Sequence, residues 1–467
     1  MGRRIGFGLI LALLVALCVG CSSAAESPIQ DSLVQPTQTL ADLGSTPIES
    51  AAEPSPSSLA SGPPTSVRAD ATRPADRRQP TLDCTPHSFP QRTQLSLTVD
   101  PKDDNKIYIG VEQEGFFKTA DGGNTWQKAV TGLKAWGSSD GSGPCYEEFY
   151  STIINPDESG HICIAMAGGP GTVSIENTSA GNNGVYCSAD GAESWNQRVG
   201  PHMNTAVYTI SADPGNFDVM YAGVNGGSCS NLPPVCAPDT YFNNVGSIYK
   251  TTDGGQTWSE LNSLAARDVR VISLHVHPLN PDLIFAATFS KVTVLGGGAG
   301  DFDASTQLGL IRSEDGGKTW TGSVDGMNPS PREQALLGFE ISPRNQSRLY
   351  VTASSNRSYW SSDSGRTFHP SPRMTAFAFD PFDAAGLHML GSNGESIQES
   401  NDGGDTWSVV SATPGFISFE RGVPTALVWS QNDPDTVFLA GPYASVHVSR
   451  DGGTTWSQLL SAELLPE

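Results

Sequence analysis

The chain has 467 residues, of which 37% are hydrophobic, and its 49 acidic residues outnumber its 27 basic ones to give a formal net charge of −22. So negative a chain argues against a nucleic-acid partner and against docking on an anionic lipid surface. The same charge suits an exposed, water-facing domain.

The first twenty residues have the order of an export signal. A basic start (Met1-Gly-Arg-Arg) precedes an apolar stretch, residues 5–20, that is too short to span a bilayer comfortably, and Cys21 follows. The pattern resembles a bacterial lipoprotein signal, which implies that residues 1–20 are removed and that Cys21 carries a lipid. Cys18 stands where that pattern favours leucine, so an ordinary secretory signal cut nearby is the alternative. We expect an exported protein of the bacterial cell envelope, lipid-anchored to a membrane outside the cytoplasm.

Residues 21–80 form a segment rich in serine, proline, alanine and threonine with few large apolar side chains. Such a segment cannot bury enough surface to offset the entropy lost on ordering. The sequence therefore predicts a disordered tether between the anchor and a folded domain at residues 81–467.

One octapeptide recurs seven times in that domain, as (Ser/Thr)-x-Asp-x-Gly-x-(Thr/Ser)-(Trp/Phe). Aspartate and the hydroxyls can bond nearby backbone groups, and glycine takes the positive φ of a tight turn. Ala192 replaces the glycine once. Apolar runs flank each copy, so each copy is expected to close a β-hairpin that the aromatic residue covers. The seven aspartates, read as structural, are Asp121, Asp190, Asp253, Asp315, Asp363, Asp402 and Asp451.

The octapeptide resembles the Asp-box, or BNR, repeat of sialidases, sortilin-type receptors, photosystem II assembly factors and some glucan hydrolases. In those families the box marks the fold and is usually remote from the ligand site. The photosystem II assembly factors resemble this chain in both the lipoprotein signal and the seven boxes, and they carry an arginine-rich patch that engages a protein partner.

Each box ends a longer unit, for which the fourth copy is the template. Strands are expected at residues 271–277, 283–289 and 308–313 and from Thr319 onward, with an Asx-Pro-type turn after the first. The shortest interval between boxes, from Phe368 to Trp407, is 39 residues. Four-stranded units of about 40–50 residues in series indicate a β-propeller. The prediction is an all-β fold: a single seven-bladed β-propeller of four-stranded antiparallel blades.

Six cysteines remain when Cys18 and Cys21 are set aside, and an even number in an oxidising compartment favours three disulfides. Cys229 and Cys236 flank a short loop, and Cys163 and Cys187 fall on neighbouring predicted strands. These pairings leave Cys84 with Cys145, although fifteen connectivities are formally possible for six cysteines. Metal binding is the weaker alternative because no CxxC pair is present.

In a blade of this topology the boxes and the first hairpin turns share one edge of the ring. The long connections, residues 131–147, 168–184, 225–245 and 290–307, fall on the opposite edge. Long loops in a compact fold are usually functional, although flexible decoration is the simpler alternative.

Arginines precede several of the innermost strands on this second edge, where they are expected to surround the channel mouth. Guanidinium groups there would suit a carboxylate, sulfate or phosphate; the alternative is that each arginine pairs with an acid at the rim. The predicted ligand face contains Arg92, Glu148, Tyr150, His202, Arg267, Arg270, Arg332, Arg373 and Arg421.

The motifs favour a binding protein over an enzyme. A sialidase needs an arginine triad, a tyrosine nucleophile with a glutamate partner and an aspartate acid/base. The Arg-Ile-Pro entry motif of sialidases is absent, and sialidases are six-bladed as a rule. His275 and His277 could bind a metal, but packing is the better interpretation. We predict a non-catalytic monomer without cofactor or metal that binds a protein segment or glycan carrying an anionic group. An exo-sialidase or other glycoside hydrolase using the same face is the alternative.

Overall fold

The computed structural model describes residues 96–111, 114–136, 145–146, 148–167, 184–198, 207–224, 247–263, 269–290, 309–327, 336–353, 357–414, 424–441, 444–461 and 465–466. All of them lie in the unit that runs from residue 78 to residue 467. The predicted signal, the tether and Cys21 lie outside the described residues. Within those ranges, no helix has the length and apolarity needed to cross a membrane.

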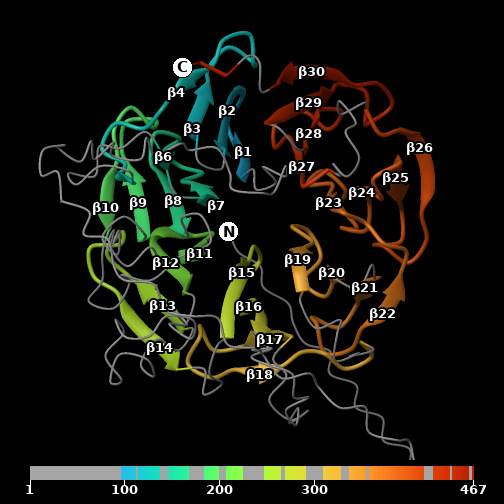
Figure 1. Cartoon of the computed structure of the whole chain (residues 1–467). Coiled ribbons are helices and arrows are strands. Elements are labelled where there is room, and N and C mark those ends of the chain that lie inside the picture. The colour runs from blue at the N-terminus through green and yellow to red at the C-terminus, as the bar shows by residue number, and fades with distance from the viewer. Residues whose placement is uncertain are drawn as a thin grey trace, which may run out of the picture. The chain divides into compact units, whose positions relative to one another are not determined.

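Seven four-stranded antiparallel sheets account for almost all of this part of the chain, and each is built from consecutive strands (Figure 1). Blade 1 consists of β1 (Ser96–Asp100), β2 (Asp103–Val111), β3 (Gly115–Thr119) and β4 (Gln127–Lys128), and blade 2 of β7 (Glu148–Ile154), β8 (Ile162–Ala167), β9 (Gly184–Ser188) and β10 (Asn196–Arg198). Blade 3 consists of β11 (Val207–Asp213), β12 (Asn216–Val224), β13 (Ser247–Thr251) and β14 (Ser259–Ser263), and blade 4 of β15 (Val269–His277), β16 (Asn280–Ser290), β17 (Leu310–Ser313) and β18 (Thr321–Gly322).

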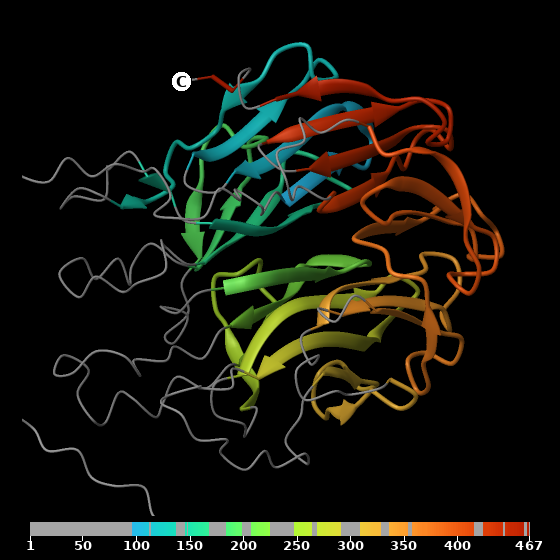
Figure 2. The ribbon, with the colours of Figure 1, turned by 45° about the vertical axis from the view of Figure 1, so that its right-hand side comes forward.

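Blades 5 to 7 repeat the arrangement (Figure 2). Blade 5 consists of β19 (Leu336–Ile341), β20 (Leu349–Ala353), β21 (Arg357–Ser361) and β22 (His369–Ser371). Blade 6 consists of β23 (Ala376–Phe379), β24 (Met389–Ser392), β25 (Ser396–Ser400) and β26 (Ser408–Ala412), and blade 7 of β27 (Ala426–Trp429), β28 (Val437–Gly441), β29 (Ser445–Ser449) and β30 (Ser457–Leu460). The predicted all-β, seven-bladed propeller is confirmed.

Within the described residues, the ring closes without a strand exchanged between its ends. The first strand of each blade is innermost and contacts the first strand of the next, and β27 of blade 7 contacts β1 of blade 1 in the same way. Apolar side chains of blades 1 and 7 form one buried cluster across this junction. Ser430 and Asn432 of blade 7 donate hydrogen bonds to the Asp104 carboxylate of blade 1, at 2.7–2.9 Å.

The hydrophobic core lies between blades and not within any one of them. Each second strand is almost wholly buried, as in Leu349–Ala353 of β20, and its side chains pack against both neighbouring sheets. Hydroxyls add bonds between innermost strands in blades 1 to 4. Thr209 Oγ1 accepts from Leu274 N at 3.0 Å, and Ser211 Oγ accepts from Val276 N at 3.0 Å. Every blade is therefore stabilised mainly by its neighbours.

Two details of the blades differ from the sequence prediction. Blade 4 was expected to begin at residue 271 with a turn at 278–282, yet β15 starts at Val269 and β16 at Asn280, because His277 pairs directly with Asn280. The connection 131–147 contains an added hairpin of β5 (Ala135–Trp136) and β6 (Cys145–Tyr146).

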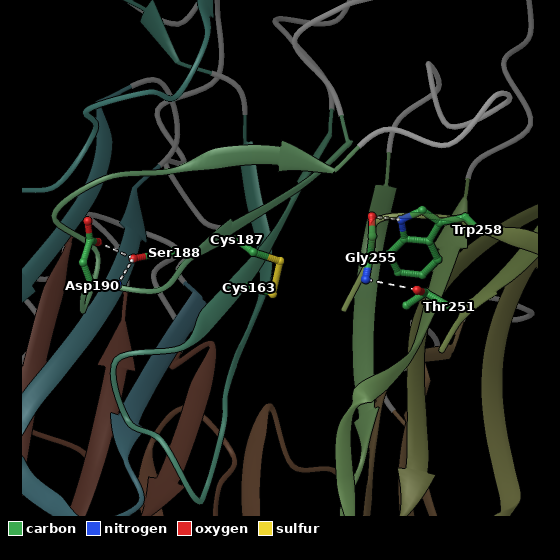
Figure 3. The surroundings of a disulfide bond; sticks show 7 residues. All are labelled: Cys163, Cys187, Ser188, Asp190, Thr251, Gly255 and Trp258. Carbon is green, nitrogen blue, oxygen red and sulfur yellow. Dashed lines mark hydrogen bonds between the residues drawn. A yellow bond between two sulfur atoms is a disulfide. The ribbon is translucent and has the colours of Figure 1, made fainter. Parts of the chain in front are cut away.

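A disulfide joins Cys163 of β8 to Cys187 of β9, which are paired residues in the sheet, so this predicted bridge is confirmed (Figure 3). Both cysteines pack in the cluster between blades 2 and 3. Cys84, Cys229 and Cys236 lie outside the described residues, and of Cys145 only the backbone is described, so the other two pairings stay predictions.

All seven boxes share one hydrogen-bond pattern, of which Figure 3 shows parts in blades 2 and 3. In blade 1, Thr119 donates to Asp121 Oδ1 and accepts from Gly123 N, while Thr125 donates to Asp121 through both its amide and its hydroxyl. These bonds, the hydroxyl of Thr125 first among them, lower the pKa of Asp121 to about 2. The box aspartates are thus acceptors already occupied by the turn.

The fourth residue of each box joins the box to the first hairpin turn of its own blade. Its amide donates to a carbonyl of that turn in all seven blades, as from Gly122 to Asn105 at 3.0 Å and from Gly452 to Asp435 at 2.9 Å. The boxes and the first hairpin turns therefore lie on one edge of the ring, which we call the box edge.

The two irregular boxes, in blades 2 and 5, are covered by the connection from the preceding blade. Trp195 N donates to Thr131 O at 2.9 Å, and Phe368 N donates to Asp325 O at 2.8 Å. Trp195 and Phe368 are only 3% and 2% exposed. Ala192 of the first of these boxes adopts a φ of 65°, so the turn keeps its left-handed geometry without glycine.

Candidate functional site

The edge opposite the boxes is where the innermost strands begin and where the predicted ligand face lies. Four of these strands carry a β-bulge at the same place: at Tyr150 in β7, Tyr208 in β11, Ile272 in β15 and Leu337 in β19. Each bulge lies five residues before the corresponding position at the first hairpin turn, which is Asn155, Asp213, His277 or Ser342. A bulge re-aims a side chain and is common beside binding sites.

Two of the bulged residues form an aromatic pair across blades 2 and 3. The rings of Tyr150 and Tyr208 have centroids 4.4 Å apart and planes inclined by 49°. Both rings are partly exposed. Tyr150 was predicted as a face residue, whereas Tyr208 was missed. The shared five-residue offset from Asn155 and Asp213 is the signal that could have identified it.

Arg373 is the one predicted arginine whose side chain is described, and it lies at the start of blade 6. Its neighbours are fixed by blade 5: Tyr350 donates to Pro372 O at 2.7 Å, and Thr352 donates to Met374 O at 3.0 Å. The guanidinium is partly exposed and has no acid within ion-pair distance among the described residues. It can therefore accept an anionic group without first breaking an ion pair within the described part of the chain.

The other members of the predicted face are not brought together by the described structure. Arg270 and Glu148 are described by their backbone only, as strand residues paired with Phe289 and Ala167. The remaining five lie outside the described residues: Arg92, His202, Arg267, Arg332 and Arg421. A ring of arginines around the mouth thus stays a prediction.

Two titratable side chains on the innermost strands have displaced pKa values, both because of burial. The pKa of His275 is lowered to about 4 and that of Glu340 is raised to about 7. His275 packs on Phe339, with centroids 4.7 Å apart. Because neighbouring residues of a strand face opposite sides, Glu340 lies on the other face of β19. The two groups therefore do not form an acid/base pair.

His277, the second histidine of the predicted pair, is buried and bonded. Its Nε2 lies 3.1 Å from Gln346 O, and its Nδ1 accepts from Leu279 N at 3.0 Å. Both ring nitrogens are thereby occupied by blades 4 and 5. Within the described ranges, no three histidine, cysteine or acidic side chains are grouped to hold a metal ion.

These observations define the class of protein: a seven-bladed β-propeller with the recurring octapeptide on every blade. No family model matches the chain. Among curated proteins, it is similar to the photosystem II assembly protein Ycf48 of Thermosynechococcus vestitus, with 27% identity over 255 residues, covering 47% of this chain and 68% of that protein.

Solved structures with the same fold have lower sequence identity. An ancestral GH74 enzyme matches with a TM-score of 0.52 and 16% identity over 79% of this chain, and the chain spans only 46% of that enzyme's length. A structure of YCF48 bound to a D1 peptide matches with a TM-score of 0.43 and 18% identity, over 68% of this chain and 83% of that one. With its TM-score of 0.52 and 16% identity, the ancestral GH74 enzyme indicates the fold alone, and function has to be argued from the site.

Proposed function

We propose that this chain is a non-catalytic propeller, tethered by a lipid on Cys21 outside the cytoplasm, that binds a segment of another protein on the edge opposite the boxes. The observation that carries the proposal is Arg373, which is partly exposed just before the innermost strand β23 and has no acid paired to it in the described structure. The Tyr150–Tyr208 pair supplies an apolar surface on the same edge.

Similarity to an assembly protein supports a protein partner. An extended segment with an acidic group would place a carboxylate on the arginine and an apolar side chain on the tyrosines. A glycan with a carboxylate would satisfy the arginine as well, and it is an outcome of the test below.

The test compares two quadruple charge reversals in the purified domain. One variant changes Arg270, Arg332, Arg373 and Arg421 to glutamate; the matched control changes the box-edge cations Lys102, Lys318, Arg366 and Arg450. Both lower the net charge by the same amount. We expect only the first to lose binding to acidic members of a displayed library of short peptides. Equal binding by both variants would contradict the proposal.

Two further measurements separate the remaining possibilities. Turnover of a fluorogenic sialoside or of a glucan oligosaccharide by the wild-type domain would replace the binding function by a glycoside hydrolase. Cell fractionation of a Cys21→Ala variant tests the anchor: we expect this variant to leave the membrane fraction, and retention there would remove the lipid from the proposal.

A further inference from the structure

A second, independent feature lies on the box edge, in a cleft of about 510 Å³ between blades 1 and 2. Pockets of about 300–1,000 Å³ are typical of small-molecule sites. Blade 1 contributes one face of its strands to the wall. Lys106 and Tyr108 are two apart on β2, Tyr108 pairs with Lys118 on β3, and Lys118 pairs with Gln127 on β4.

The opposite wall is the box and first turn of blade 2. It contains Ser159, Gly160, Asp190, Gly191 and Glu193. Lys118 crosses the cleft and donates to Gly191 O at 2.8 Å and to Glu193 Oε1 at 2.6 Å. Charges of both signs are therefore fixed within one small volume.

Tyr108 is the group that this arrangement leaves without a partner. It is only 3% exposed and lines the cleft, yet its phenol makes no hydrogen bond among the described residues. In blade 3 the tyrosine at the same strand position, Tyr221, donates to the box carbonyl of the next blade, Gly316 O, at 3.3 Å. In blade 1 the matching carbonyl, Gly191 O, is already taken by Lys118.

A second donor beside the phenol is also unsatisfied. The ammonium of Lys106 lies 3.8 Å from Asp100 and 3.9 Å from Asp103, beyond hydrogen-bond distance of either carboxylate. The buried phenol of Tyr108 without a partner costs stability, and the partly exposed ammonium of Lys106 lines the same cleft. Together these two donors point to a ligand that accepts from both.

The charge in the cleft selects the class of ligand. Two lysines face three carboxylates, on Asp121, Asp190 and Glu193, with Asp100 and Asp103 close behind. Burial, and after it the charges of Asp100, Asp103 and Glu193, raise the pKa of Tyr108 to about 12, so the phenol stays protonated and donates at neutral pH. An anion would be repelled. A neutral group with several hydroxyls can accept from the phenol and the ammonium and donate to the carboxylates.

We infer that the cleft between blades 1 and 2 is a binding site for a neutral sugar ring, with Tyr108 and Lys106 donating to its hydroxyls and the Glu193 carboxylate accepting from one of them. This site lies on the edge opposite the proposed protein-binding face and does not rest on it. The ring can be a free sugar or the terminal residue of a glycan, since the chemistry recognised is the same.

The experiment titrates the full chain with methyl glycosides of glucose, galactose, mannose and N-acetylglucosamine, followed by saturation-transfer NMR and calorimetry. Glucosamine and N-acetylneuraminate serve as the cationic and anionic comparators. We expect at least one neutral glycoside to bind, and to bind more tightly than the anionic comparator. Longer oligosaccharides ending in the same sugar then distinguish a glycan from a free sugar.

Tyr108→Phe removes only the phenol oxygen and should weaken that binding about five- to tenfold, as expected for one lost hydrogen bond. It should leave the melting temperature unchanged or raised, because the oxygen has no protein partner. The matched control is Tyr221→Phe, which should lower the melting temperature and leave sugar binding intact. The inference fails if no neutral glycoside binds, if the anion binds more tightly, or if Tyr108→Phe binds as the wild type does.

Discussion

The interface between blades 5 and 6 is sealed at the box edge, whereas the interface between blades 1 and 2 is open there. In the sealed interface, Arg348 donates to Gly403 O at 3.0 Å and also to Asp402 O, and its guanidinium stacks 4.2 Å from the centre of the Trp360 ring. Ser371 donates to Gly404 O at 2.5 Å. In the open one, the flexible side chain of Lys118 takes the corresponding carbonyl and leaves space behind it.

The difference shows that the same box carbonyl can belong to a sealed or to an open interface, according to which side chain of the preceding blade reaches it. The planar guanidinium of Arg348 fills the space between blades 5 and 6 and stacks on a tryptophan ring. The ammonium of Lys118, at the end of a thin aliphatic chain, satisfies the box carbonyl of blade 2 but fills little of the space between blades 1 and 2. Tyr350 and Tyr108 occupy matching places in β20 and β2. The first is bonded to Ser371 and Pro372, and the second faces the cleft without a partner in the described chain.

Lowering the pH should have the largest effect on stability, and this effect should not distinguish the sealed interface from the open one. The pKa values of Asp121, Asp253 and Asp315 are lowered to about 2, so their folded-state bonds stabilise the protein above the unfolded pKa near 4. That contribution is lost as the pH falls from about 4 to about 2. We expect the melting temperature to drop steeply across this interval, and a flat profile there would contradict the role given to the boxes.

Removing the seal should be the most damaging single substitution. Arg348→Ala leaves two box carbonyls without their donor and removes the stack on Trp360, so we expect a loss of about 3 kcal/mol in the free energy of unfolding. Urea unfolding measures it. Lys118→Ala, at the open interface, should cost about 1 kcal/mol, and equal losses for the two variants would erase the distinction between sealed and open.

Removing a phenol oxygen sharpens the same comparison. Tyr350→Phe deletes an oxygen with two partners in a residue that is 0% exposed, and should cost about 1–2 kcal/mol. Tyr221→Phe, with one partner at 3.3 Å, should cost about 1 kcal/mol or less. Thermal unfolding of the three variants measures these losses. The loss of stability should be largest for Tyr350→Phe, smaller for Tyr221→Phe and smallest for Tyr108→Phe.

The smallest effect on stability is expected from changing Glu193, the acid that is paired with Lys118. Glu193 is 70% exposed, so Glu193→Gln should change the free energy of unfolding by less than about 1 kcal/mol. The bond from Lys118 to Gly191 O survives this change. Urea unfolding measures this change. A loss of unfolding free energy as large as that of Arg348→Ala would contradict the description of the blade 1–2 interface.

The repeats predicted the fold because each box contains its own turn chemistry. Serine or threonine, aspartate and glycine at fixed spacing specify a hairpin, and seven hairpins at blade spacing specify the ring. The Cys163–Cys187 bridge was predictable for the same reason, since the strands were already placed.

The sites were less predictable, because they depend on competition between side chains distant in sequence. Nothing local to Tyr108 shows that Lys118 binds Gly191 O, the carbonyl equivalent to the Gly316 O that Tyr221 reaches. Likewise the bulge that presents Tyr208 is a property of strand register and not of composition. Arg373 was predicted from its place before an innermost strand, but its lack of an acidic partner within the described chain is a tertiary fact.

The closure of the ring has a mechanical consequence. Among the described residues, blades 1 and 7 meet through packed side chains and the bonds to Asp104 without a main-chain connection, whereas every other pair of neighbouring blades is also joined by the chain itself. Force applied between the two ends of the domain would therefore part this seam first. A circular permutant cut at another junction would move the weak point there and leave the seven sheets unchanged.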